Sequence, residues 1–132
     1  MNREIKFRGK RTYNNEWIYG SLIDNKFIFD KDYDNYDIYY DEEYGIIDGR
    51  LLEVDSKTIG QYTGLKDKNG VDVYEGDKVI FDYEWTEPDE IGVITWNKDT
   101  ASFQIKGHIP SSSMKHLDRM KVIGNIYENE VD

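Results

Sequence analysis

Cysteine is absent from the 132 residues, and the sequence has only two prolines and two histidines. Without cysteine the chain has no disulfide framework, no thiol nucleophile and no zinc site built on thiolates. Nothing approaches the roughly 18 uninterrupted apolar residues of a membrane-spanning helix, and the first residues, MNREIKFRGKR, contain no apolar core of a secretion signal. These absences predict a cytoplasmic protein that does not associate with a membrane.

The sequence also lacks the patterns that usually carry catalysis. His108 and His116 lie eight positions apart, with no carboxylate or second histidine at the spacing of metal ligands. No Gly-x-Ser-x-Gly elbow surrounds Ser111, and the segment from Gly60 to Gly64 lacks the lysine of a phosphate-binding loop. We therefore expect no catalytic residue, no cofactor, no metal and no enzymatic activity. A hydrolase with scattered carboxylates stays a third hypothesis.

Aromatic residues are abundant: the sequence has eleven tyrosines, five phenylalanines and three tryptophans. Disordered chains are poor in such residues, so we expect a folded core. Apolar residues recur mostly with a period of two, which is typical of strands buried on one face. The predicted fold class is all-β, with one short helical turn near residues 111–120, where Met114 and Leu117 follow Pro110.

Turn-forming residues separate the expected strands. Asp48-Gly49 is a dipeptide favoured in two-residue hairpin turns, so we predict a hairpin between 44–47 and 50–54. The run from Asp67 to Gly70 predicts another turn, and at Gly76-Asp77 we expect a structural turn whose aspartate accepts a backbone N–H. A loop is expected at 86–90. The predicted strands are 4–8, 16–23, 26–29, 37–40, 44–47, 50–54, 58–65, 78–85, 91–96, 101–106 and 121–127.

We expect residues 1–132 to form a single domain built from two β subdomains that share a boundary near residues 57–75. Residues 1–65 would form a β meander with an acidic, tyrosine-rich loop. Residues 71–128 show three meandering strands, a helical turn and a closing strand, which is the order of an SH3-like small barrel. Neither half is expected to be stable alone, because an open sheet of two or three strands needs a partner surface.

Several motifs spread over the chain resemble one family. Outside residues 24–50, they resemble the YopX family of small proteins encoded by phages and prophages of bacteria. The resemblance implies an all-β architecture with an SH3-like C-terminal part, and a phage or prophage origin in a bacterial host cell. It supplies no catalytic residue, and Ser56 stands where the family pattern would have a proline. The motifs are Ile5-Lys6-Phe7-Arg8, Trp17-Ile18-Tyr19-Gly20, the run from Thr58 to Gly70, the run from Tyr74 to Val79, and the run from Val122 to Asn129.

The net charge of −10 is unevenly distributed. Residues 24–55 carry eleven acids against three bases, a charge of −8 that repels polyphosphate. Residues 1–23 carry five bases against two acids, a charge of +3. With aromatic residues nearby, these bases are a candidate nucleic-acid patch, although we favour their pairing with the acidic middle of the chain. The candidate patch comprises Arg3, Lys6, Arg8, Lys10 and Arg11.

The acidic segment also contains closely spaced tyrosines. Tyrosine combines a large contact area with few rotors and a polar tip, which suits interfaces, although alternate rings packing under a sheet would give the same pattern. Asp30, Asp32 and Asp34 have the spacing of calcium ligands, but Asn35 replaces the glycine of such a loop, so we favour a solvated loop. The candidate interaction surface comprises Tyr33, Tyr36, Tyr39, Tyr40 and Tyr44.

Together these observations predict a non-enzymatic phage or prophage accessory protein. It would bind a protein partner, from the host or the phage, or assemble with itself as a homo-oligomer through open sheet edges. The alternative is a nucleic-acid-binding protein, or an acidic protein that imitates DNA and occupies a host DNA-binding protein. Nucleic acid is the less favoured partner because of the negative charge.

Overall fold

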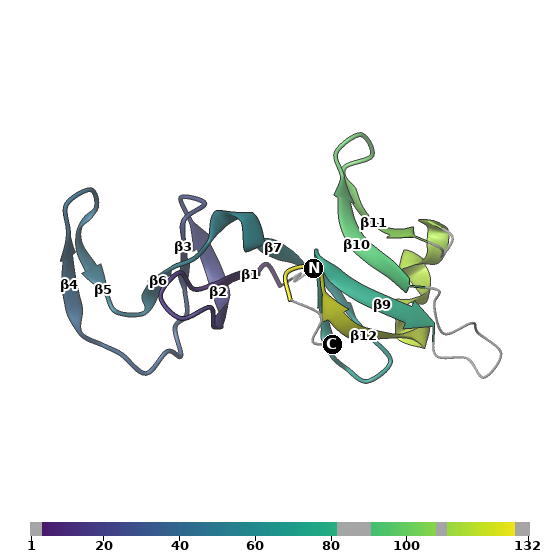
Figure 1. The fold of residues 1–132 in the computed structure, drawn as a ribbon, viewed down its shortest axis with the longest axis horizontal. Helices are drawn as coiled ribbons and strands as arrows, with labels where there is room; N and C mark the ends of the chain where they lie inside the picture. Colours follow the sequence, from purple (N-terminus) through teal and green to yellow (C-terminus); the bar gives the residue numbers. More distant parts are fainter. Residues whose placement is uncertain (1–3, 82–90, 108–110, 129–132) are drawn as a thin grey trace. The chain divides into compact units, whose positions relative to one another are not determined.

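The computed structural model describes residues 4–81, 91–107 and 111–128, and Figure 1 shows short strands throughout. The end of the strand predicted at 78–85, and the loop predicted at 86–90, lie outside these residues. Strands dominate the described chain, so the predicted all-β class is confirmed. No helix within the described ranges is long and apolar enough to cross a membrane.

The chain separates into two compact units, which we call the N-terminal unit, Ile5–Gln61, and the C-terminal unit, the residues from Tyr62 onward together with Met1–Glu4. The N-terminal unit contains β1 (Phe7–Lys10), β2 (Trp17–Ile23), β3 (Phe27–Phe29), β4 (Ile38–Asp41), β5 (Gly45–Asp48), β6 (Leu51–Glu53), the 3-10 helix η1 (Ser56–Thr58) and the start of β7 (Gly60–Lys66). The C-terminal unit contains the rest of β7, β8 (Asp72–Tyr74), β9 (Asp77–Phe81), β10 (Ile91–Asn97), β11 (Ser102–Gly107), the 3-10 helix η2 (Ser111–Arg119) and β12 (Met120–Asn125).

In the N-terminal unit, β2 pairs antiparallel with β1 and β3, and β3 pairs with β6. The alternating apolar residues of these strands meet in a small core, which buries Ile18, Ile28, Leu52 and Val54. Gly20 is required where β2 passes β3, because a Cβ at this position would lie 2.0 Å from the backbone oxygen of Phe29. The glycine of the Trp17–Gly20 motif therefore has a steric role.

The hairpin predicted around Asp48-Gly49 is wrong. Strand β5 pairs with β4, with Tyr40 opposite Ile46, whereas β6 pairs with β3. Asp48 accepts bonds from the backbone and side chain of Arg50, and the Gly49 N–H donates to the Asp37 oxygen at 2.7 Å. The dipeptide therefore marks the point where the chain leaves one strand pair and enters another.

In the C-terminal unit, β9, β10 and β11 form an antiparallel meander, and β12 pairs with the other edge of β9. The 3-10 helix η2 precedes β12, so the strand order predicted for residues 71–128 is present, as is the helical turn predicted near 111–120. Strand β8, which pairs with β7, was not among the predicted strands. The core comprises Val73, Val79, Ile94, Ile105, Leu117 and Met120.

Two buried aspartates organise the backbone of the C-terminal unit. Asp77 accepts the N–H of Tyr74 at 2.7 Å, as predicted for this turn. Asp67 is 5% exposed, and its carboxylate accepts the N–H groups of Asn69, Val71 and Val122 at 2.8, 2.9 and 3.0 Å. Since Val122 lies in β12, one carboxylate joins a local turn to a strand distant in sequence.

We expect Asp67→Ala to destabilise the protein by about 3 kcal/mol, because three backbone donors lose their acceptor and some remain buried. Chemical denaturation measures this change, and amide hydrogen exchange should accelerate at Val122. Asp118 is exposed on η2, so Asp118→Ala should change stability by no more than about 0.5 kcal/mol. Equal destabilisation by the two substitutions would contradict the role assigned to Asp67.

Candidate functional site

Strands β4 and β5 form a two-stranded ribbon in the acidic segment (Figure 1). Tyr40 lies opposite Ile46, and Ile38 is two residues before Tyr40, so the three side chains share one face of the ribbon. Ile38, Tyr40 and Ile46 are 71, 77 and 75% exposed. We call these three residues the apolar face, because their exposed side chains are neighbours on one side of the ribbon.

The opposite face of the ribbon is bonded to the segment that precedes it. Tyr39 lies on this face, opposite Ile47, and its hydroxyl accepts a hydrogen bond from Asn35 Nδ2 at 2.9 Å. Asn35 Oδ1 in turn accepts the N–H of Asp37 at 3.0 Å. These bonds hold the base of the ribbon while the apolar face stays exposed.

The five tyrosines of the predicted interaction surface therefore have different environments. Tyr40 belongs to the apolar face, Tyr39 is exposed on the opposite face of the ribbon, and Tyr36 is exposed in the segment before it. Tyr33 packs against the core of the N-terminal unit, and Tyr44 packs edge-on against Phe27 with ring centroids 5.0 Å apart. Sequence analysis missed Ile38 and Ile46, although the Ile-x-Tyr alternation places residues 38 and 40 on one face.

Three cations of the N-terminal unit each lie over two aromatic rings. Arg11 lies over Tyr13 and Tyr33, at 5.1 and 5.5 Å from the ring centroids. Lys26 is 5.4 Å from both the Phe27 and the Tyr44 rings, and Arg50 is 5.2 Å from Phe29 and 4.9 Å from Tyr36. Such contacts add an attraction between cation and ring quadrupole. Tyr33, Tyr36 and Tyr44 thus have intramolecular partners.

Carboxylates hold two of these cations as well. Lys26 Nζ lies 3.7 Å from both Glu43 and Glu53, and Arg50 makes a 2.7 Å ion pair with Asp48. Hydrogen bonds from the Arg50 side chain lower the pKa of Asp48 to about 2. Near the ribbon turn, the hydrogen bond that Tyr44 donates to Asp24 raises the pKa of Tyr44 to about 12.

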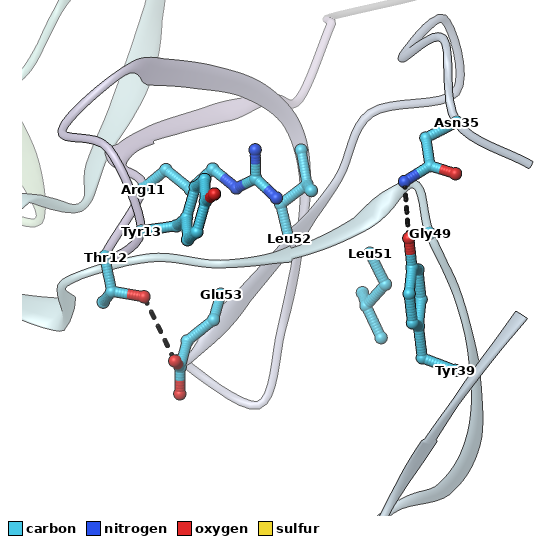
Figure 2. A pocket seen from close by; sticks show the side chains of 9 residues that line it. All are labelled: Arg11, Thr12, Tyr13, Asn35, Tyr39, Gly49, Leu51, Leu52 and Glu53. Carbon is cyan, nitrogen blue, oxygen red and sulfur yellow. Dashed lines mark hydrogen bonds between the residues drawn. The ribbon is translucent and has the colours of Figure 1, made fainter. Parts of the chain in front are cut away.

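A pocket of about 400 Å³ lies within the N-terminal unit, between the base of the ribbon and the segment after β1. Figure 2 shows two hydrogen bonds at its wall: Thr12 Oγ1 donates to Glu53 at 3.1 Å, and Asn35 donates to Tyr39. Buried Leu52 supplies part of its apolar surface. The lining residues are Arg11, Thr12, Tyr13, Asn35, Tyr39, Gly49, Leu51, Leu52 and Glu53.

Comparison with known proteins supplies the wider context. The model of the YopX family, described as "YopX protein", matches residues 6–131, nearly the whole chain. The chain belongs to the YopX family. Among solved structures, the crystal structure of protein EF1440 from Enterococcus faecalis is similar, with a TM-score of 0.60 and 26% identity over 97% of this chain and 96% of that one. No curated protein matches the chain.

In this YopX protein, the predicted basic patch is spread over different environments. Arg3 lies outside the described residues. Arg8 is 5% exposed and lies over the Trp17 ring at 4.8 Å, and Lys10 lies over the same ring at 5.8 Å. Lys6 is half-buried, and Arg11 lines the pocket. Nucleic-acid binding by these residues stays a prediction.

Hydrogen bonds within residues 30–33 order the backbone at the start of the acidic segment. Asp30 Oδ1 accepts the N–H of Asp32 at 3.0 Å, and the Asp30 carbonyl accepts the N–H of Tyr33 at 3.1 Å. Within the part of the chain that the structure describes, no three His, Cys, Asp or Glu side chains form a group that could hold a metal ion.

The Asp48 carboxyl should titrate near pH 2 in the folded protein, against an ordinary value of 3.8. Its pKa is lowered on folding, so its contribution to stability is present above about pH 4 and is lost as the pH falls toward 2. Carboxyl ¹³C NMR measures the midpoint, which Arg50→Gln should raise toward the ordinary value, although the bond from the backbone N–H of residue 50 remains. Lys31→Gln removes the same charge from an exposed site and should leave it unchanged; an unmoved midpoint in Arg50→Gln would contradict the assignment.

Proposed function

We propose that the chain is a phage or prophage accessory protein that acts by binding a protein partner through the apolar face of the β4–β5 ribbon, without a catalytic step of its own. The observation that carries the proposal is the exposure of Ile38, Tyr40 and Ile46, at 71, 77 and 75%, on one face of the ribbon. Burying such side chains contributes roughly 1.5–3 kcal/mol each, enough for three residues to anchor a complex.

The ribbon also offers backbone bonding to a partner. Within the described residues, β4 and β5 pair with each other and with no third strand, so each has an outer edge available. An extended segment that pairs with either edge would gain main-chain hydrogen bonds, and its alternate side chains could cover the apolar face.

Charge defines the partner further. Residues 24–55 carry eleven acids against three bases, and Asp41, Glu42 and Glu43 lie at the ribbon turn. A complementary surface would be apolar at its centre and basic at its rim, because opposite potentials increase the association rate and favour one partner over another. The phage or prophage origin that the YopX resemblance implies makes a host or phage protein the natural candidate.

A photocrosslinking amino acid placed at position 40 should form an adduct with one protein in bacterial cells, because this position would be buried in the complex. The same amino acid at Ile126, an exposed position of the C-terminal unit, is the matched control. Mass spectrometry identifies the adduct. Identical adducts at both positions, or none at position 40, would count against the proposal, and an adduct of two copies of the chain would assign the face to self-assembly.

Affinity for the partner so identified should fall about tenfold or more with Tyr40→Ser or Ile46→Ser, because each removes an apolar contact. Ile126→Ser should leave the affinity unchanged. Titration calorimetry measures these values, and higher salt should weaken binding through the basic rim. A partner whose affinity is insensitive to both ribbon substitutions does not bind the apolar face.

A further inference from the structure

The Arg11 pocket, lined as described above, has a feature that binding at the apolar face does not use. Of the three cations held between aromatic rings in the N-terminal unit, Lys26 and Arg50 also contact carboxylates. Within the described chain, Arg11 has no carboxylate within ion-pair distance. Its side chain donates one hydrogen bond, from Nη1 to the Tyr33 hydroxyl at 2.8 Å. In a chain with 27 acidic residues, a guanidinium that faces a pocket without an acidic partner is a candidate anion site.

The guanidinium is also held in position. It contacts the Tyr13 and Tyr33 rings and donates to the Tyr33 hydroxyl, while the Arg11 N–H donates to the Glu16 oxygen and the Arg11 carbonyl accepts the Asn15 N–H, at 2.8 Å each. Arginine has five N–H donors in a rigid fork that matches a carboxylate, and one of the five is used here. A held guanidinium loses less entropy on binding than a mobile one.

Glu53 also lines the pocket, and its carboxylate has partners other than Arg11. Its carboxylate accepts Thr12 Oγ1 at 3.1 Å and lies 3.7 Å from Lys26 Nζ. Lys26 is shared with Glu43, so Glu53 keeps part of its negative charge, and Arg11 is the lining residue that can attract an anion.

The rest of the wall is suited to an apolar group. Leu51 and Leu52 contribute aliphatic surface, and Tyr13, which is 83% exposed, contributes its ring beside Arg11 (Figure 2). The volume of about 400 Å³ is within the range of small-molecule sites, which combine apolar walls with a few polar anchors.

We propose that this pocket binds a carboxylate attached to an apolar body, with Arg11 holding the carboxylate and the Leu51, Leu52 and Tyr13 side chains contacting the body. A free aromatic or aliphatic acid and the C-terminus of a peptide share this chemistry. The inference does not rest on the apolar face, so either site can fail without the other.

The test is an NMR titration of the full chain with N-acetyl-phenylalanine, its uncharged amide, and an acetylated tripeptide ending in phenylalanine with a free carboxylate. The acid should give saturable shifts at the Arg11 side-chain N–H and at the Leu51 and Leu52 amides. The amide should bind at least about tenfold more weakly, because it lacks the charge-assisted bonds. Tighter binding of the tripeptide than of the acid assigns the ligand to a chain terminus, and equal binding assigns it to a free acid.

Arg11→Gln should lower the affinity for N-acetyl-phenylalanine about tenfold. Lys31→Gln, which removes the same charge outside the pocket, should leave this affinity unchanged. If Arg11→Gln loses the dispersed spectrum of the folded protein, Tyr13→Ala is the deciding variant, because its side chain is exposed and it should weaken binding severalfold. Equal shifts with acid and amide, no saturable shift at Arg11, or equal affinities of the deciding variant and Lys31→Gln would overturn the proposal.

Discussion

Strand β3 pairs antiparallel with β6, with Ile28 opposite Leu52, and both candidate sites depend on this pairing. It buries these two side chains in the core of the N-terminal unit. Residues 30–50 form a long connection between β3 and β6. The entropy of closing such a loop grows only slowly with its length, so the core tolerates it. The ribbon in this segment has no neighbouring strand among the described residues, which leaves its edges open, and its apolar face is exposed. The pocket lies where the chain returns to the core at β6.

Aromatic rings hold the cations of the N-terminal unit in place. Lys26 and Arg50 have both a carboxylate and two rings, whereas Arg11 has two rings and a tyrosine hydroxyl. A single exposed ion pair contributes little, because solvent screens it and two side chains lose rotamer freedom. Stacking on rings adds contact area that solvent screens less. Tyr33, Tyr36 and Tyr44 therefore contact cations of the same unit. Only some of the tyrosines in the acidic segment are left to contact a partner.

The sequence predicted most strands, because alternation with a period of two is a local property of half-buried strands. It did not predict which strands pair. Asp48-Gly49 has the composition of a hairpin turn, yet Leu52 packs into the core against Ile28, and this long-range burial determines the partner of β6. Turn chemistry acts locally, whereas the choice of partner depends on packing between distant residues. The hydrogen bond between Asp67 and Val122, which are 55 positions apart, could not be predicted from the sequence for the same reason.

For the candidate sites too, the sequence predicted local features but not the contacts between distant residues. Tyr40 was predicted because an aromatic residue in an acidic segment is a local signal, whereas the identity of the exposed face required the pairing of Tyr40 with Ile46. Arg11 was predicted within a basic patch, but its role depends on Tyr33, a residue 22 positions away whose hydroxyl it reaches. Composition indicated which segments matter, and only the strand pairing separated the residues that face solvent from those that hold the segment together.

An apolar ribbon with open edges would pair with other copies of itself unless something opposed it. The acids of residues 24–55 provide that opposition, since their net charge of eleven acids against three bases is −8 on every copy. Two copies that pair ribbon to ribbon approach with charges of the same sign, and screening is incomplete within a Debye length of about 8–10 Å. The same negative charge attracts a basic partner. Under the proposed function, this charge opposes self-pairing of the face that exposes Ile38, Tyr40 and Ile46 and attracts a cationic protein to it.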